Sequence, residues 1–274
     1  MTNDETWTFA YASAIGTSHV RTGTPCQDSA LCDVLEDACG NDILFAAVSD
    51  GAGSAQRSQE GSHVACEFFR DSLQRWLLGH NLSELSREMM AEWVSLFRLS
   101  LQVKAEDEGL RVRDYACTLL LALLGTDQAA FFQIGDGAIV VANRSEPGVF
   151  APFFWPQMGE YANTTNFLTD DDAATTLSFK VVDAVMDEVA VFSDGIQAMV
   201  LHYASKTAHA PFFEHMLAAI RKEQGVGRSE RLSQGLAQFL ASDQLNSKTD
   251  DDKTLVLATR RRDRPASTMS ENAA

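Results

Sequence analysis

The 274-residue sequence has few cationic side chains and no long apolar run. It holds 22 lysines and arginines against 38 aspartates and glutamates, which gives a formal net charge of −16. This charge repels the phosphates of nucleic acids and of anionic membranes, so we expect neither as a partner. No apolar segment approaches the length that spans a bilayer. A site for cations, by contrast, is compatible with an acidic chain.

Cysteine is also scarce. There are five, an odd number, and none forms a CxxC pair: Cys26, Cys32, Cys39, Cys66 and Cys117. The acidic start of the chain lacks the apolar centre of a signal peptide. We therefore predict a reduced, cytoplasmic setting. His19 precedes three of the cysteines, but the spacing matches no standard zinc pattern and favours scattered buried thiols.

The apolar patterns that are present predict an α+β fold, because strand pairs and helix pairs are segregated along the chain. We expect a single domain over residues 1–259 and a basic, then polar, disordered tail over 260–274. Strands are predicted at 7–12, 31–35, 43–48, 116–124, 129–134, 138–142, 175–182, 189–192 and 254–259. Helices are predicted at 59–78, 83–108, 196–223 with a break near Pro211, and 229–240.

Three finer expectations concern how these elements join and pack. Ser83 is the predicted N-cap of the second helix, whose inner face would carry Leu85, Met89, Trp93, Leu96 and Leu101. Gly135-Asp136-Gly137 is predicted to be a turn between antiparallel neighbours. Residues 15–29 are expected to form a loop.

A long irregular segment over 145–172 contains three prolines and several aromatic residues. A loop of this length in a compact domain is usually functional. We predict that the segment 145–172 is a substrate-facing flap, because residues 159–163 are too polar for a core, with a structural cover over one sheet edge as an equal alternative.

Aspartates recur where apolar strands end. Asp50 follows the strand at 43–48 and Asp194 follows the strand at 189–192, while Asp136 and the run 250–252 lie beside other strands. One such aspartate is most simply a turn cap. Several on different rigid elements predict a site for a hard divalent cation, which needs converging oxygen ligands.

These residues resemble five ordered motifs of the metal-dependent protein phosphatase 2C family. They are Gln27-Asp28, the stretch Val48 to Gly53, Cys117-Thr118 with Gly135-Asp136-Gly137, Val191 to Gly195, and Asp251 to Val256. The resemblance covers nearly the whole chain. It implies a sandwich of two antiparallel β-sheets flanked by helix pairs, with metals at one edge.

The resemblance also implies a reaction and a ligand set. Two ions, Mn²⁺ or Mg²⁺, would activate a water that attacks the phosphomonoester. Asp50 would bridge the ions, and Gly51 would contribute its backbone carbonyl or position a metal-bound water. Asp194 and Asp251 would hold one ion, and Asp28 would act through water.

Some positions depart from the family pattern. Gln27 replaces the usual glutamate of the early acidic pair, so its part in metal binding is weaker. The family's phosphate-binding arginine would correspond to Arg21, shifted by two residues; a plain surface arginine is the equal alternative. Alanine stands where some members have a general acid, and His19 could substitute for it, although a loop histidine bonded to backbone is slightly favoured. Asp136 matches one ligand of a third ion, but Ala198 replaces the other.

Two functions follow from these patterns. The first is a serine/threonine phosphatase acting on phosphorylated proteins, the products of a cognate serine/threonine kinase. The second is a catalytically weak module that binds and regulates a phosphoprotein. The intact set of Asp28, Asp50, Asp194 and Asp251 favours the enzyme.

Overall fold

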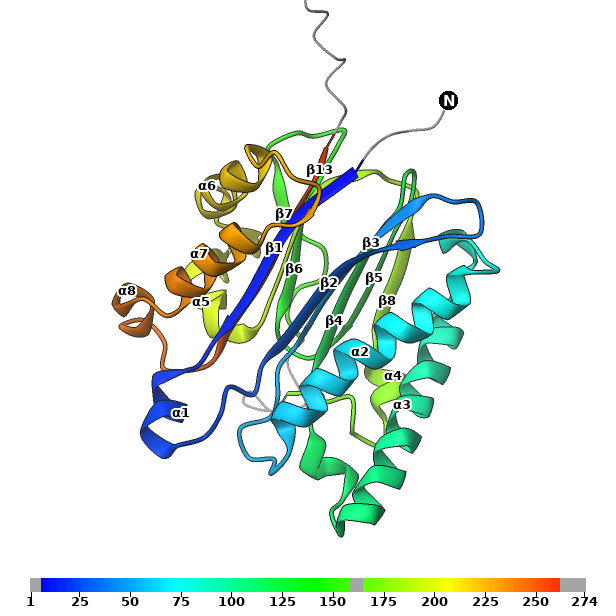
Figure 1. Ribbon diagram of the computed structural model, residues 1–274, viewed down its shortest axis with the longest axis vertical. Helices are drawn as coiled ribbons and strands as arrows, with labels where there is room; N and C mark the ends of the chain where they lie inside the picture. Colours follow the sequence, from blue (N-terminus) through cyan, green and yellow to red (C-terminus); the bar gives the residue numbers. More distant parts are fainter. Residues whose placement is uncertain (1–5, 158–164, 262–274) are drawn as a thin grey trace, which may run out of the picture.

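The computed structural model describes residues 6–157 and 165–261, which form two stacked β-sheets (Figure 1). One sheet has the order β12-β1-β13-β9-β6-β7 and the other β2-β3-β4-β5-β8. The strands of the first are β1 (Thr6–Ala14), β6 (Ala138–Asn143), β7 (Phe150–Pro152), β9 (Met186–Phe192), β12 (Gly227–Arg228) and β13 (Lys253–Arg261). Those of the second are β2 (Ser29–Glu36), β3 (Asp42–Ser49), β4 (Leu119–Leu124), β5 (Ala129–Ile134) and β8 (Ser178–Val182).

All neighbouring strands are antiparallel except the short β12, which runs parallel to β1. Buried side chains from both sheets, such as Phe9, Leu44, Phe131 and Val191, meet between them. The predicted sandwich of two antiparallel sheets is thus confirmed.

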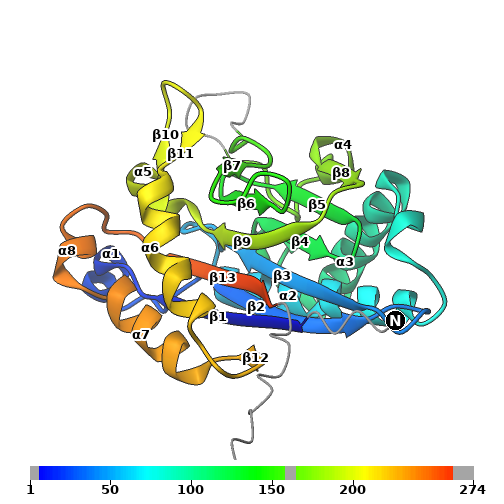
Figure 2. The ribbon, with the colours of Figure 1, turned by 90° about the horizontal axis from the view of Figure 1, so that it is seen from above.

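Helices cover both outer faces of the sandwich (Figures 1 and 2). The pair α2 (Ser58–Leu77) and α3 (Arg87–Glu108) packs on the β2–β8 sheet. The pair α6 (Ala210–Arg221) and α7 (Glu230–Leu240) packs on the other sheet. The shorter helices are α1 (Thr17–Thr22), α4 (Ala173–Thr176), α5 (Gln197–Val200) and α8 (Asp243–Asn246), and β10 (Leu201–His202) pairs with β11 (Thr207–Ala208) in a separate hairpin.

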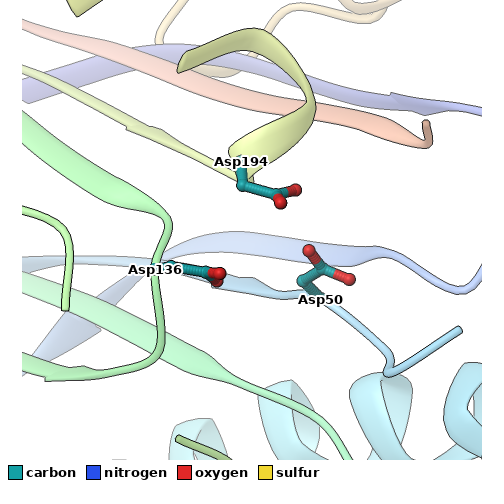
Figure 3. Close-up of side chains that lie close together, drawn as sticks. All are labelled: Asp50, Asp136 and Asp194. Atoms are coloured by element: carbon teal, nitrogen blue, oxygen red, sulfur yellow. The ribbon is translucent and has the colours of Figure 1, made fainter. Parts of the chain in front are cut away.

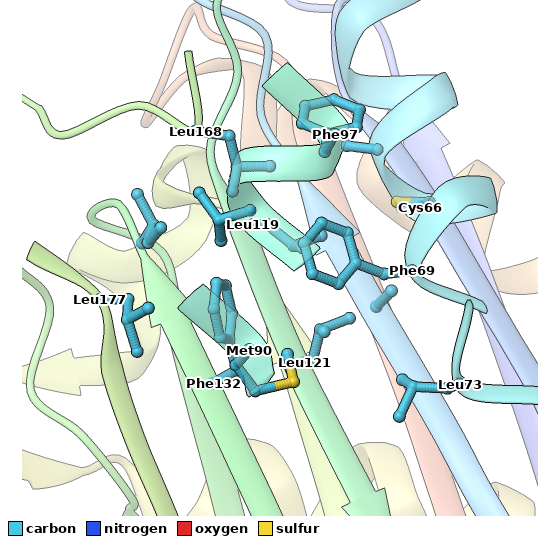
Figure 4. Close-up of a cluster of buried hydrophobic side chains, with 14 of the residues drawn as sticks. Cys66, Phe69, Leu73, Met90, Phe97, Leu119, Leu121, Phe132, Leu168 and Leu177 are labelled. Carbon is cyan, nitrogen blue, oxygen red and sulfur yellow. The ribbon is translucent and has the colours of Figure 1, made fainter. Parts of the chain in front are cut away.

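The core beneath α2 and α3 corrects the predicted face of the second helix (Figure 4). The helix begins after Ser86, whose hydroxyl accepts a hydrogen bond from the Met89 N–H, and not after Ser83. Its buried residues are Met90, Val94, Phe97, Leu101 and Ala105. Of the predicted stripe within the helix only Leu101 is fully buried, and Leu96 is 46% exposed. The predicted helical spacing of the apolar residues was right, but the predicted stripe is displaced by about one residue from the buried one.

Gly135-Asp136-Gly137 does not join neighbouring strands. β5 belongs to one sheet and β6 to the other, so this segment crosses between the sheets. Gly135 has φ 118°, and a Cβ there would lie 2.5 Å from Thr118. The antiparallel prediction holds for β4 and β5 but is wrong for β6, because the tight glycine turn redirects the chain into the opposite layer.

Other boundaries also differ. The predicted loop at 15–29 contains α1, and the predicted strand at 175–182 begins with α4. The predicted helix at 196–223 is interrupted by the β10–β11 hairpin. The last strand continues to Arg261, because the buried Arg260 packs over Trp7 and donates to the Gly125 carbonyl. Within the predicted flap at 145–172, β7 pairs with β6 at the edge of its sheet, and residues 158–164 lie outside the described residues, as does the tail beyond Arg261.

Across the described ranges, none of the helices combines the length and the apolar character needed to cross a bilayer.

Candidate metal centre and active site

Three aspartates from distant parts of the chain meet at one end of the sandwich (Figure 3). Asp50 follows β3, Asp136 lies in the crossing from β5 to β6, and Asp194 follows β9. Each side chain is partly buried, and one carboxylate oxygen from each lies within 4.8 Å of the other two. Since both sheets contribute, the packing of the sandwich itself positions the cluster.

Thr118 fixes the backbone at Asp50. Its hydroxyl accepts from the Asp50 N–H at 2.9 Å, and its own N–H donates to the Asp50 carbonyl at 2.8 Å. The next residue, Gly51, is enclosed by backbone, because a Cβ there would lie 2.6 Å from the Gln27 carbonyl and 2.8 Å from that of Ser58. Close approach of three backbone segments therefore requires glycine at this position.

Asp50 and Asp194 hold protons more tightly than isolated aspartates, because the pKa of each is raised. Burial, followed by the charges of Asp28 and Asp194, raises the pKa of Asp50 well above its ordinary value. Burial and then the charges of Asp136 and Asp251 raise the pKa of Asp194 to about 6. Without cations, the negative charges thus repel one another and lack solvent.

Asp28 lies beside this cluster and not within it. It is 7% exposed, and its carboxylate accepts from the Ser193 hydroxyl at 2.7 Å. The same hydroxyl accepts from the Thr254 N–H at 3.1 Å. Burial is the main cause that raises the pKa of Asp28 to about 7, although the hydrogen bonds oppose it.

Asp252 organises the loop that precedes Asp28. This aspartate is 3% exposed and accepts from the Gly16 and Gln27 N–H groups, each at 2.6 Å, and from His19 Nδ1 at 2.9 Å. A carboxylate only accepts, so His19 carries its proton on Nδ1 in these bonds. The favoured backbone partner for His19 is thus wrong: its partner is a buried carboxylate. The sequence showed Asp252 in the last motif without revealing this role.

The remaining predicted residues are more exposed or lie apart. Asp251 is exposed, although its charge acts on both Asp50 and Asp194. Arg21 lies in α1 and donates to Asp250 at 2.9 Å in an ion pair whose partners are 65% and 64% exposed. Gln27 is 5% exposed, and its side-chain oxygen is buried without a hydrogen-bond partner among the described residues.

The donor set fits hard divalent cations. The cluster offers only carboxylate oxygens, which Mn²⁺ and Mg²⁺ prefer over softer ligands. Asp194 Oδ1 is buried and has no hydrogen-bond partner within residues 6–157 and 165–261. A buried oxygen that lacks a donor is costly unless a cation or water satisfies it.

Comparison with known proteins agrees with this fold and identifies a family. The family model described as protein phosphatase 2C matches residues 15–241. A curated relative from Escherichia coli (strain K12), serine/threonine-protein phosphatase 3, is 37% identical over 255 residues, which cover 92% of this chain and 98% of that protein.

Solved structures show the same fold at lower identity. A bacterial serine phosphatase is 14% identical with a TM-score of 0.58 and covers 94% of this chain and 99% of that one. The serine/threonine phosphatase Stp1 from Staphylococcus aureus is 15% identical with a TM-score of 0.56, over 92% and 94% of the two chains. The resemblance found in the sequence is therefore confirmed, and the chain belongs to the protein phosphatase 2C family.

Proposed function

We propose that this protein hydrolyses phosphoserine and phosphothreonine in proteins with the aid of two Mn²⁺ or Mg²⁺ ions held at the Asp50 cluster. The observation that carries the proposal is the convergence of Asp50, Asp136 and Asp194 from three chain connections. Membership of a protein phosphatase family agrees with a phosphomonoester hydrolase. The alternative of a weak binding module is not favoured, because a family match and an all-oxygen cluster occur in the same chain.

Each residue of the site would have a distinct part in binding the ions. Asp50, Asp194 and Asp136 would hold the ions, with Asp251 and the Gly51 carbonyl as further ligands and Asp28 acting through water. Bound ions of this kind lower the pKa of water and neutralise phosphate charge. Thr118 keeps Asp50 in place through two hydrogen bonds, so the site is rigid before the substrate arrives. Gln27 can accept one hydrogen bond from bound water through its side-chain oxygen.

We assign the phosphate contact to Arg21. Its present ion pair with Asp250 is exposed, and such pairs contribute about 0–1 kcal/mol, so Arg21 can exchange Asp250 for a phosphate at low cost. A guanidinium suits a phosphate because it can donate two parallel hydrogen bonds. The loop that carries α1 is tied by Gly16 and His19 to Asp252, next to Asp251.

The substrate partner would be a protein phosphorylated by a cognate serine/threonine kinase. We place the protein in the cytoplasm, a location supported by the buried thiols of Cys32, Cys66 and Cys117. Burial raises the pKa of each of these thiols, which keeps them protonated and unreactive.

The decisive experiment measures hydrolysis of p-nitrophenyl phosphate and of a phosphoserine peptide by purified protein. We expect activity with added Mn²⁺ or Mg²⁺, loss on exhaustive chelation, and recovery when the ion is restored, because carboxylate sites of this kind exchange such ions readily. Full activity after chelation would refute the metal assignment. Absence of activity in every metal tested would favour the binding module.

A further inference from the structure

A hairpin stands beside the carboxylate cluster and has no part in the proposed chemistry. β10 and β11 pair through Leu201 with Ala208 and His202 with Thr207, and the hairpin projects from the body of the protein next to β7 (Figure 2). Leu201 and Ala208 are buried in the core under α6. The base of the hairpin is therefore fixed, while residues 202–207 are exposed.

Tyr203 connects this hairpin to the cluster. Its hydroxyl donates to the side-chain oxygen of Gln197 at 2.7 Å, and the Gln197 amide donates to the backbone carbonyl of Asp136. Gln197 is 5% exposed, so the link is shielded from water. The charges of Asp194 and Asp136 also reach the Tyr203 hydroxyl and contribute, after burial, to its raised pKa.

The exposed ring of Tyr203 forms an aromatic edge with the partly buried Trp155, which packs against the core under α6. The two ring centroids lie 5.5 Å apart at 88°, and Tyr203 is 53% exposed. An exposed aromatic side chain at a fixed position commonly marks a binding surface, since it offers apolar area with little loss of side-chain entropy. The buried Gln197 links Tyr203 of this edge to Asp136 of the cluster. A peptide whose phosphate lies at the cluster can therefore contact the edge.

We propose that the Tyr203–Trp155 edge binds the residues that flank the phosphorylated side chain and that it prefers basic residues there. This inference rests on the proposed function and names the substrate class of the same site. The protein has a net charge of −16, which attracts cationic peptides. An arginine or lysine above an aromatic face gains a further cation–π attraction.

The test uses two phosphoserine peptides that differ only in the two residues before the phosphoserine, arginine in one and glutamate in the other. We expect the wild-type protein to have the lower KM for the arginine peptide. Tyr203→Ala and Trp155→Ala should each raise that KM about fivefold, the ratio for about 1 kcal/mol of cation–π binding energy. Hydrolysis of p-nitrophenyl phosphate by Trp155→Ala should stay unchanged, because this small substrate does not reach the edge.

Two further variants separate recognition from positioning. Tyr203→Phe keeps the ring and removes the hydroxyl, so it should retain peptide affinity. Lys206→Asn, on the same hairpin, should leave the KM for the arginine peptide unchanged; asparagine tolerates the positive φ of 52° at this site. An unaltered peptide KM in both alanine variants would overturn the proposal. Equal losses for peptide and p-nitrophenyl phosphate would also overturn it, since the link would then only position Asp136.

Failure of the proposed function gives a different result. In that case the wild-type protein hydrolyses neither substrate, and the labelled arginine and glutamate peptides can be titrated directly in Mn²⁺ by fluorescence anisotropy. Weaker binding of the arginine peptide to Tyr203→Ala than to wild type would support the edge as a binding surface without catalysis. Equal binding to both proteins would overturn it.

Discussion

Replacing Asp50 with asparagine should stabilise the metal-free protein and abolish its turnover. Carboxylate oxygens of the cluster lie within 4.8 Å of one another. Two unit charges at that distance repel by about 3.5 kcal/mol at an effective dielectric constant of about 20. Asp50→Asn removes this repulsion wherever Asp50 is ionised, while keeping nearly the same shape. We therefore expect metal-free Asp50→Asn to unfold at a temperature equal to or above that of the wild type.

The raised pKa values also predict how the stability of the metal-free protein changes with pH. The folded-state pKa values of Asp28 and Asp194 are raised to about 7 and about 6, above the value of about 3.9 in unfolded chains. The folded protein then binds more protons than the unfolded chain, so stability is lost as pH rises from about 4 to about 7. Each such group contributes a slope of about 1.4 kcal/mol per pH unit. Asp50 also has a raised pKa, and Asp50→Asn should make the slope shallower.

Turnover should respond in the opposite direction. Metal activation of water contributes several kcal/mol, and each ~1.4 kcal/mol is tenfold in rate, so loss of a bridging ligand should cost several orders of magnitude. Asp28→Asn, which acts through water, should cost about 10–100-fold.

The control for both variants is Asp250→Asn, the same exchange in an exposed ion pair, which should change neither property. Near-normal turnover of Asp50→Asn would refute the assignment of Asp50, and simple unfolding would favour a turn cap.

Three further outcomes are expected. Arg21→Ala should raise the KM for phosphopeptides about tenfold with little change in thermal stability, because its ion pair is exposed; an unchanged KM would identify a plain surface arginine. Gly51→Ala should lower the free energy of unfolding by about 1–3 kcal/mol in denaturant titrations, because the added Cβ would lie 2.6 Å from a backbone carbonyl. The control is Gly79→Ala, which should be tolerated because its Cβ would meet no described atom within 4 Å. Asp252→Asn should cost about 1.5–3 kcal/mol and weaken Mn²⁺ binding, because three donors lose a charged acceptor; normal stability would contradict this role.

The sequence predicted the elements whose signal is local. β5 matches its predicted bounds, and β3 extends the predicted strand by one residue at each end, because continuous apolar runs end at polar residues. The predictions were wrong where contacts between distant parts of the chain determine the bounds or the connection of an element. The start of α3 depends on which serine caps it, and Ser86 does so because Ser83 lies in a separate turn at Leu82–Glu84. The buried stripe is displaced from the predicted one by about one residue, which corresponds to a rotation of about 100° around the helix axis.

The crossing at Gly135-Asp136-Gly137 was misread for a related reason. A glycine turn between two apolar strands looks like a hairpin in the sequence, and only the pairing of β5 with β8 and of β6 with β9 shows that the chain changes sheets. This change is what brings Asp136 to Asp50 and Asp194. A hairpin would have kept Asp136 at the edge of one sheet, so the sequence, which indicated Asp136 only as a ligand of a third ion, did not show that it lies with Asp50 and Asp194.

The acidic motif at the start of β13 combines two roles that its sequence does not separate. Asp251 is exposed and acts on the cluster by charge, whereas Asp252 is buried and is satisfied by three donors from residues 16–27. A buried carboxylate with three N–H partners has its hydrogen-bond acceptors satisfied without a cation. A carboxylate such as Asp194, with a buried oxygen that no described donor reaches, does not. Hydrogen bonding, more than the number of aspartates, therefore distinguishes the residues that build this site from those available to hold an ion.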